Sequence, residues 1–201
     1  MELKTVGESP LNPSSSVWSE VSKEVIKLKP VPVDAQPNQY IRNAYKDTPY
    51  GNVGEVSLSV AEHDNQVFVR LEWDDSNEPN IEFQDAAGVF FPESGSSESP
   101  ETIGTKSNPV RLWMWKNRTE LQSGLSNSTD LISSGPGVFH PVEGSQSVNA
   151  EANLSNGKWS VVISGGKNIV EGSRKLGIVV WDGSNNERAG IGAVSSNWIE
   201  I

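Results

Sequence analysis

The chain has 201 residues, of which 35% are hydrophobic and seven are tryptophan, enough apolar material for one substantial core. Its eighteen glycines and twelve prolines are too many turn-forming residues for a helical protein. The formal net charge of −10 argues against a nucleic-acid partner or an anionic membrane surface, because both require clustered lysines and arginines. The absence of cysteine excludes disulfides, thiolate metal sites, iron–sulfur clusters and covalently attached c-type haem. Any haem would have to bind non-covalently.

The first part of the sequence predicts an N-terminal arm followed by one domain. Residues 1–16 contain prolines and serines without an apolar period, so we expect an arm that lies on the surface or is mobile. Residues 17–201 form the expected domain. The spacing of the valines in 17–29 allows a short helix, and the charges around Val25 and Ile26 also allow a strand. The opening residues lack the apolar stretch of a signal peptide, so either the protein is cytosolic or a leader has been removed.

From Glu55 onward the pattern is that of short β-strands. Apolar and polar residues alternate in 56–60 and 67–73, on either side of a turn at 63–65, which predicts a hairpin with one buried face. Asn156-Gly157 between two further apolar runs is a strong hairpin signal. Further strands are expected at 85–91, 109–116, 148–154, 159–164, 176–181 and 193–201. Seven or eight such strands with regular turns predict an all-β, antiparallel β-sandwich with short helical additions.

The alternation also predicts which side chains are buried. The expected core residues are Val67, Val69, Leu71, Trp159, Val161, Ile163, Val179 and Trp181. In the run 109–116, Leu112 and Met114 should share one face of the strand, and Trp113 and Trp115 the other. Most tryptophans lie on expected strands, where large aromatic side chains usually fill a sandwich core.

The sequence contains no recognisable catalytic constellation. Nucleophilic catalysis requires a cysteine, or a serine with a histidine partner, and the only histidines are His63 and His140. His63 adjoins an expected turn, and His140 precedes a proline; for both we favour a structural or surface role over a ligand role. No phosphate-binding glycine motif occurs, and no metal site is expected. The isolated chain is therefore expected not to be an enzyme.

Four segments, taken together, resemble the gamma subunits of type II dimethyl sulfoxide reductase family complexes. This is the ethylbenzene dehydrogenase gamma subunit family, which includes the gamma subunits of dimethyl sulfide dehydrogenase, selenate and chlorate reductases and nitrite oxidoreductase. The segments are 67–75 (VFVRLEWDD), 83–92 (FQDAAGVFFP), 108–116 (NPVRLWMWK) and 179–188 (VVWDGSNNER), with Ser195–Trp198 after the last. The resemblance implies a β-sandwich that holds one b-type haem between a methionine and a lysine and relays electrons for a molybdenum catalytic subunit. It also implies an exported, periplasmic protein.

The sequence departs from this family at the haem ligands. The family's methionine commonly precedes a glycine before the Pro-Val strand, and here that dipeptide is Ile103-Gly104. The resemblance leaves Met114 as the candidate sulfur ligand and Lys167 or Lys175 as the candidate amine ligand. A lysine can bind iron only as the neutral amine. A lysine that often precedes the family's closing Ser-x-Ser-x-Trp segment is replaced near Gly192.

Three functions are compatible with these observations. In the first, the chain is a b-haem electron-transfer subunit that uses Met114, or an unexpected ligand, with Lys167 or Lys175. In the second, which the loss of the methionine favours, the scaffold has lost haem and serves interaction or assembly within a molybdoenzyme complex, with or without self-association. The third is a carbohydrate-binding sandwich with exposed tryptophans. Partner contacts are expected in the polar, glycine-punctuated stretches 93–108 and 122–141.

Overall fold

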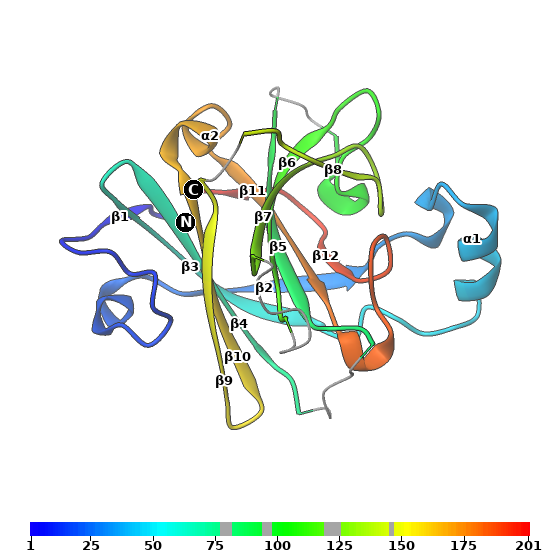
Figure 1. The fold of residues 1–201 in the computed structure, drawn as a ribbon, viewed down its shortest axis with the longest axis horizontal. Coiled ribbons are helices and arrows are strands. Elements are labelled where there is room, and N and C mark those ends of the chain that lie inside the picture. The colour runs from blue at the N-terminus through cyan, green and yellow to red at the C-terminus, as the bar shows by residue number, and fades with distance from the viewer. Residues whose placement is uncertain (77–81, 94–97, 119–125, 145–146) are drawn as a thin grey trace.

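The chain forms an antiparallel β-sandwich. The computed structural model describes residues 1–76, 82–93, 98–118, 126–144 and 147–201. Within these residues most of the chain is sheet, arranged in two facing layers (Figure 1). The strands are β1 (Lys4–Thr5), β2 (Glu24–Pro30), β3 (Glu55–His63), β4 (Gln66–Asp74), β5 (Ala86–Pro92), β6 (Val110–Lys116), β7 (Ser128–Ser133), β8 (Phe139–Pro141), β9 (Asn149–Ser155), β10 (Lys158–Gly166), β11 (Lys175–Trp181), β12 (Ala193–Ser195) and β13 (Ile199–Glu200). The expected fold class is confirmed.

The strands follow one hydrogen-bonded path that folds over itself at β2. The order is β8-β7-β6-β5-β11-β12-β2-β3-β4-β10-β9, with β1 beside β3 and β13 beside β11. The first residues of β2 pair with β3, and its last residues pair with β12, so this strand belongs to both layers. We call the layer that contains β3, β4, β10 and β9 the first layer, and the layer that contains β8 to β5, β11 and β12 the second layer. At the two ends of the path, β8 and β9 are edge strands.

Short helical elements connect the strands. Asn38 caps α1 by accepting a hydrogen bond from the Tyr40 backbone N–H. The helices are α1 (Gln39–Tyr45) and α2 (Lys167–Glu171), with 3₁₀ turns η1 (Ser16–Glu20), η2 (Val33–Ala35), η3 (Pro100–Thr102) and η5 (Gly183–Asn185). Among the described residues, none of these helices has the length and apolar character needed to cross a membrane.

The main core lies between the layers and contains six of the eight side chains that the alternation predicts, whereas Val179 and Trp181 lie in a second cluster on the outer face of the second layer. All eight expected core residues are buried. On β6, Trp113 and Trp115 face the main core, whereas Leu112 belongs to the second cluster on the other side of the strand, where Met114 packs against it. Trp113 lies directly on the backbone of the facing strand β10: a Cβ placed on Gly165 would be 2.4 Å from its ring. The glycine therefore makes room for the indole.

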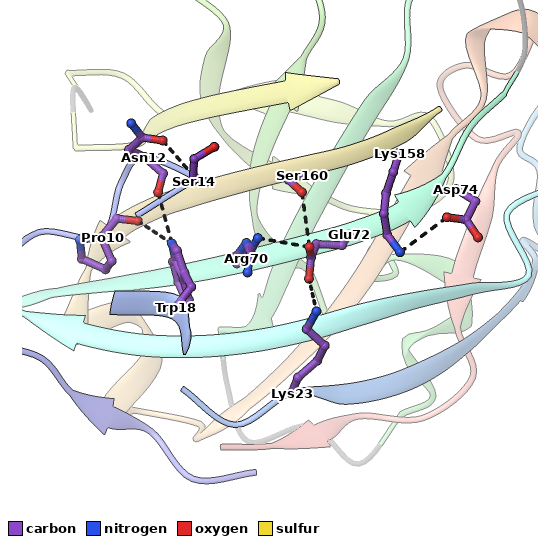
Figure 2. Close-up of polar contacts among 10 residues, drawn as sticks. All are labelled: Pro10, Asn12, Ser14, Trp18, Lys23, Arg70, Glu72, Asp74, Lys158 and Ser160. Carbon is purple, nitrogen blue, oxygen red and sulfur yellow. Dashed lines mark hydrogen bonds and ion pairs between the residues drawn. The ribbon is translucent and has the colours of Figure 1, made fainter. Parts of the chain in front are cut away.

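The N-terminal residues cover the outer surface of the first layer. β1 pairs with β3, and Trp18, from η1, packs with Phe68 and Val162 on the face that points away from the main core. The Trp18 indole N–H lies 3.0 Å from the Pro10 carbonyl oxygen and 3.2 Å from that of Asn12, so the tryptophan also holds the preceding turn (Figure 2). We call residues 1–21 the N-terminal strap.

A charged network follows the strap on the same surface (Figure 2). Glu72 on β4 lies 2.6 Å from the Lys23 amine and 3.1 Å from the Arg70 guanidinium, and Ser160 donates to it from β10. Arg70 also contacts the Trp18 ring. Burial alone would raise the pKa of Glu72, but Lys23 and Arg70 lower it below its ordinary value. The carboxylate therefore stays ionised and joins Lys23, two residues after the strap, to the sheet.

Candidate functional site

The outer face of the second layer is where the family resemblance places a haem ligand. Side chains on this face form a second apolar cluster, which we call the outer core. Its buried members are Val31, Ala86, Phe90, Ile103, Val110, Leu112, Leu131, Val179, Trp181 and Val194. The chain segment before β6 brings Ile103 onto this face, and β6 itself contributes Leu112.

Ile103, in the family's methionine position, is completely buried in the outer core. It follows η3 with a left-handed backbone (φ 52°), which is unusual for a β-branched residue. The surroundings hold it in place: its N–H lies 2.9 Å from the Pro100 carbonyl, and its own carbonyl accepts from the Ser133 hydroxyl. A hydrocarbon side chain fixed in this way offers no ligand atom to iron.

Met114 and Lys175 lie on the same face of the same layer. Met114 packs at the rim of the outer core. It is paired with Gly88 of β5, and Gly88 is paired in turn with Val179 of β11. Lys175 lies four residues before Val179, a distance of about 13 Å along the strand. Two axial ligands must approach iron from opposite sides of the porphyrin, so a haem between these residues would have to stand on edge on the sheet.

The space between Met114 and Lys175 is filled by aromatic rings. Phe90 is fully buried there and lies flat on β11: a Cβ placed on Gly177 would be 2.2 Å from its ring. The Trp198 ring covers Phe90, with ring centroids 5.5 Å apart in an edge-to-face arrangement. A porphyrin in this position would have to displace both rings.

Lys167 is held as a cation at another part of the molecule. Its amine lies 2.8 Å from Glu62 and 3.6 Å from Glu171, beside α2. The hydrogen bond to the Glu62 carboxylate raises the pKa of Lys167 above its ordinary value. The neutral amine that iron binding requires is therefore disfavoured, and neither Ile103 nor Met114 is among its described contacts.

The position of the family's closing lysine is also filled. A Cβ placed on Gly192 would be 2.7 Å from Cδ1 of Trp181, so the Trp181 ring packs directly against the Gly192 backbone. Trp181 donates to the Ala189 carbonyl at 2.9 Å and contacts the Phe139 ring. Beside Gly104 and Val110, a small hollow of about 10 Å³ has room for one water molecule. The residues present on this face do not fit an axially ligated haem.

The histidines offer no alternative pair of ligands. Nδ1 of His63 lies 3.0 Å from the Val6 carbonyl, where it helps to hold the strap, and His140 is exposed on the edge strand β8. In the part of the chain that the structure describes, no three histidine, aspartate or glutamate side chains are arranged to hold a metal ion. The stretches expected to contact partners, 93–108 and 122–141, contain η3, β7 and β8, while 94–97 and 122–125 fall outside the described residues.

A carboxylate pair that the sequence analysis did not single out lies at one end of the sandwich. Oδ2 atoms of Asp75 and Asp85 lie 3.2 Å and 3.3 Å from the same Trp159 indole nitrogen, and the Gly183 N–H donates to Asp85. Burial raises the pKa of Asp85 to about 6, and the nearby charges of Asp75 and Asp182 add to the increase. Burial also raises the pKa of Glu187, which accepts from the Gly51 and Asp182 backbone N–H groups. These acids join loops from three of the four quoted segments.

We expect Asp85→Asn to stabilise the protein at pH 8 and to weaken its pH dependence between pH 5 and pH 7. Because the pKa of Asp85 is higher in the folded state than in the unfolded state, the folded state binds more protons in this range, and wild-type stability rises as the pH falls. Asp85 is only partly buried, so the gain at pH 8 should be about 1 kcal/mol, less than the full shift would give.

Urea unfolding at pH 5, 6, 7 and 8 measures this difference. The exposed Asp47→Asn is the matched control and should leave the curve unchanged. A variant Asp85→Asn that keeps the wild-type pH dependence would show that Asp85 is not the titrating group.

Comparison with known proteins supports the resemblance noted in the sequence. No family model matches the chain. It is 27% identical over 202 residues to a protein named as a respiratory nitrate reductase heme subunit of Haloferax mediterranei, covering 94% of this chain and 67% of that protein. It is 29% identical over 151 residues to the chlorate reductase subunit gamma of Ideonella dechloratans (68% and 59%), and 24% identical over 208 residues to the dimethylsulfide dehydrogenase subunit gamma of Rhodovulum sulfidophilum (95% and 74%). The chain thus spans about six to seven tenths of the length of the first two.

The chain is an all-β sandwich with a second, outer apolar core, and the described residues contain no recognisable catalytic constellation. Its homologues are gamma subunits of the type II dimethyl sulfoxide reductase family, at modest identity, and the resemblance seen in the four quoted segments is confirmed.

Proposed function

We propose that the chain is a gamma-like subunit of a molybdoenzyme complex related to nitrite oxidoreductase and to the other type II dimethyl sulfoxide reductase enzymes, and that it acts through protein contacts without a stoichiometric haem. Its relatives are subunits of nitrate reductase, chlorate reductase and dimethylsulfide dehydrogenase, so protein subunits are the expected partners. The observation that carries the second part is Ile103, which is fully buried where the family has its methionine.

The remaining features of the proposal rest on the same resemblance. An exported, periplasmic location is inferred from the relatives' class and not from this chain's own residues. We retain the division into an arm of residues 1–16 and a domain of residues 17–201. The arm makes up most of the strap, which packs on the outer surface of the first layer. Self-association within the complex is compatible with the proposal.

Electron transfer through a b-type haem is the second candidate, since one relative is named as a heme subunit. It would require Met114 with Lys167 or Lys175 as ligands. The ring of Phe90 fills the space before Lys175, and Lys167 is held in ion pairs, so both pairs of ligands are disfavoured. The carbohydrate-binding alternative receives less support. Six of the seven tryptophans are buried, and the seventh, Trp198, packs on Phe90, so no flat platform of exposed tryptophans is present.

We expect the purified chain to retain much less than one haem per chain after incubation with excess haem under reducing conditions and desalting. Without a sulfur ligand at Ile103, weak binding without a complete axial pair is the most that the outer core would support. The visible absorption spectrum measures both stoichiometry and ligation. Protein isolated from its native source should give the same result.

Three substitutions make this test decisive. A sharp six-coordinate b-type spectrum at one haem per chain, lost in Met114→Ala and in Lys167→Ala or Lys175→Ala, would establish electron transfer and reject the assembly role. Lys158→Ala is the matched control, because Lys158 is a half-exposed lysine whose described ion pair is with Asp74, away from the outer core. It should leave any spectrum unchanged.

A further inference from the structure

The edge strand β9 is exposed over most of its length. Alternation along β9 places Ala150, Ala152 and Leu154 opposite Ile163, Val161 and Trp159 of β10, on the face of the main core. The last two of these β9 side chains are exposed, and Leu154 is 44% exposed, one of the few large hydrophobic side chains at the surface. The end of β9 that carries Ala152 and Leu154 is therefore exposed on its inward face.

A groove lies beneath this strand. It holds about 430 Å³ and is lined by residues 150–154 of β9, by Trp115 and Trp159, and by Asn117 and Asn127. Both tryptophans are buried members of the main core, so the groove leads directly to that core. No described segment of the chain covers it.

The backbone of β9 is ready to pair with another strand. The two-residue turn Asn156-Gly157 has φ angles of 52° and 69°, as in a type I′ hairpin, so the flanking pair Ser155 and Lys158 is hydrogen-bonded. Bonded and non-bonded pairs alternate along an antiparallel ladder. The N–H and C=O groups of Leu154, Ala152 and Ala150 therefore point away from β10.

This edge lacks the features that usually prevent pairing. Natural edge strands are commonly short, or carry lysine, proline or a bulge. β9 has seven residues, pairs with β10 in unbroken register, and carries Glu151 as its single charge. The backbone groups that point outward belong to the residues whose side chains face the groove. One added strand would therefore bind these backbone groups and cover the groove with its own side chains.

We propose that β9 is a docking edge that accepts an extended strand of a partner subunit, which completes the first layer and closes the groove. The strand would present larger apolar side chains at alternate positions toward Leu154, Trp115 and Trp159, and a basic side chain on its other face toward Glu151. This inference rests on the proposed role in protein association. A second copy fits less well: each chain has a net charge of −10, and antiparallel self-pairing about Ala152 would offer the groove mainly alanine side chains.

The test uses a synthetic peptide with the sequence of β10, Lys158–Gly166, in which leucine replaces Trp159, because this sequence already alternates in the required way. Amide and indole NMR shifts of the full chain should change for 149–155 and for the Trp115 and Trp159 side chains. Ala152→Pro removes one outward N–H without removing a bond to β10 and should weaken binding at least about tenfold. Ala152→Ser keeps that N–H and should bind within about twofold of wild type.

A peptide that is N-methylated on the amides that face β9 should not bind; it repeats the test without altering the protein. Absence of shifts in β9 at roughly 1 mM peptide would overturn the proposal, as would equal binding of the proline and serine variants. Dimerisation of the chain that Ala152→Pro abolishes would assign the edge to a second copy and overturn it as well. None of these results depends on haem, so they stand apart from the reconstitution experiment.

Discussion

Replacing Trp113 with alanine is expected to lower the free energy of unfolding by about 3–5 kcal/mol. The Trp113 ring is fully buried between the layers, with Phe91 at a ring-centroid distance of 4.6 Å on one side and the Gly165 backbone on the other. Its removal leaves a large cavity, and the rigid strands β6 and β10 cannot close it fully. Urea unfolding followed by circular dichroism measures the loss.

Two further variants separate the cavity from other effects. The indole N–H of Trp113 is buried without a hydrogen-bond partner among the described residues, so Trp113→Phe removes an unsatisfied donor as well as ring volume. It should therefore cost less than about 2 kcal/mol. Tyr40→Ala, on the exposed side of α1, should change stability by less than about 0.5 kcal/mol. If alanine at 113 cost no more than alanine at 40, the packing of Trp113 would not matter to the fold.

The parts of the fold that could be predicted are those that follow from local periodicity. The alternation in 67–73 and the Asn156-Gly157 turn determine strand, register and buried face together, because a shift of one residue would expose every apolar side chain. The same rule correctly separated Met114 from Trp113 on β6. Neither inference required knowledge of distant contacts.

The elements that could not be predicted depend on contacts between distant segments. β7 lies in a polar stretch, and its Asp130 is buried because the Arg111 guanidinium on the neighbouring strand binds both carboxylate oxygens. α1 has no apolar stripe and depends on its cap. The docking of the strap likewise depends on Trp18, which local pattern alone does not distinguish from a surface residue.

The candidate haem site shows the same division. The sequence alone shows that Ile103 has no ligand atom, because the residue type and its position in the motif are sufficient. Tertiary packing decides the rest: it pairs Lys167 with Glu62 and places Phe90 in the space before Lys175. The lysines are therefore visible in the sequence, but their positions relative to the outer core are not.

The second large effect is expected at the strap, where Trp18→Ala should lower the free energy of unfolding by about 3 kcal/mol. The Trp18 ring covers Phe68 and Val162 on the outer surface of the first layer, and its N–H satisfies the Pro10 and Asn12 carbonyls. Without the ring, these carbonyls lose their donor and the apolar side chains beneath become exposed to water. Thermal and urea unfolding measure the change.

The same variant should also release the strap before the whole domain unfolds. The strap is held by β1, by the contact between His63 and the Val6 carbonyl, and by Trp18, which is its largest buried side chain. Hydrogen exchange of the amides in residues 4–21 should therefore accelerate by at least about tenfold in Trp18→Ala, whereas amides of β4 and β10 should follow the global change. Ser19→Ala, which alters a neighbouring exposed residue, serves as control. Equal acceleration in the strap and in the core strands would mean that the strap and the sandwich unfold as one unit, so that Trp18 stabilises the whole sandwich and does not act as a local anchor.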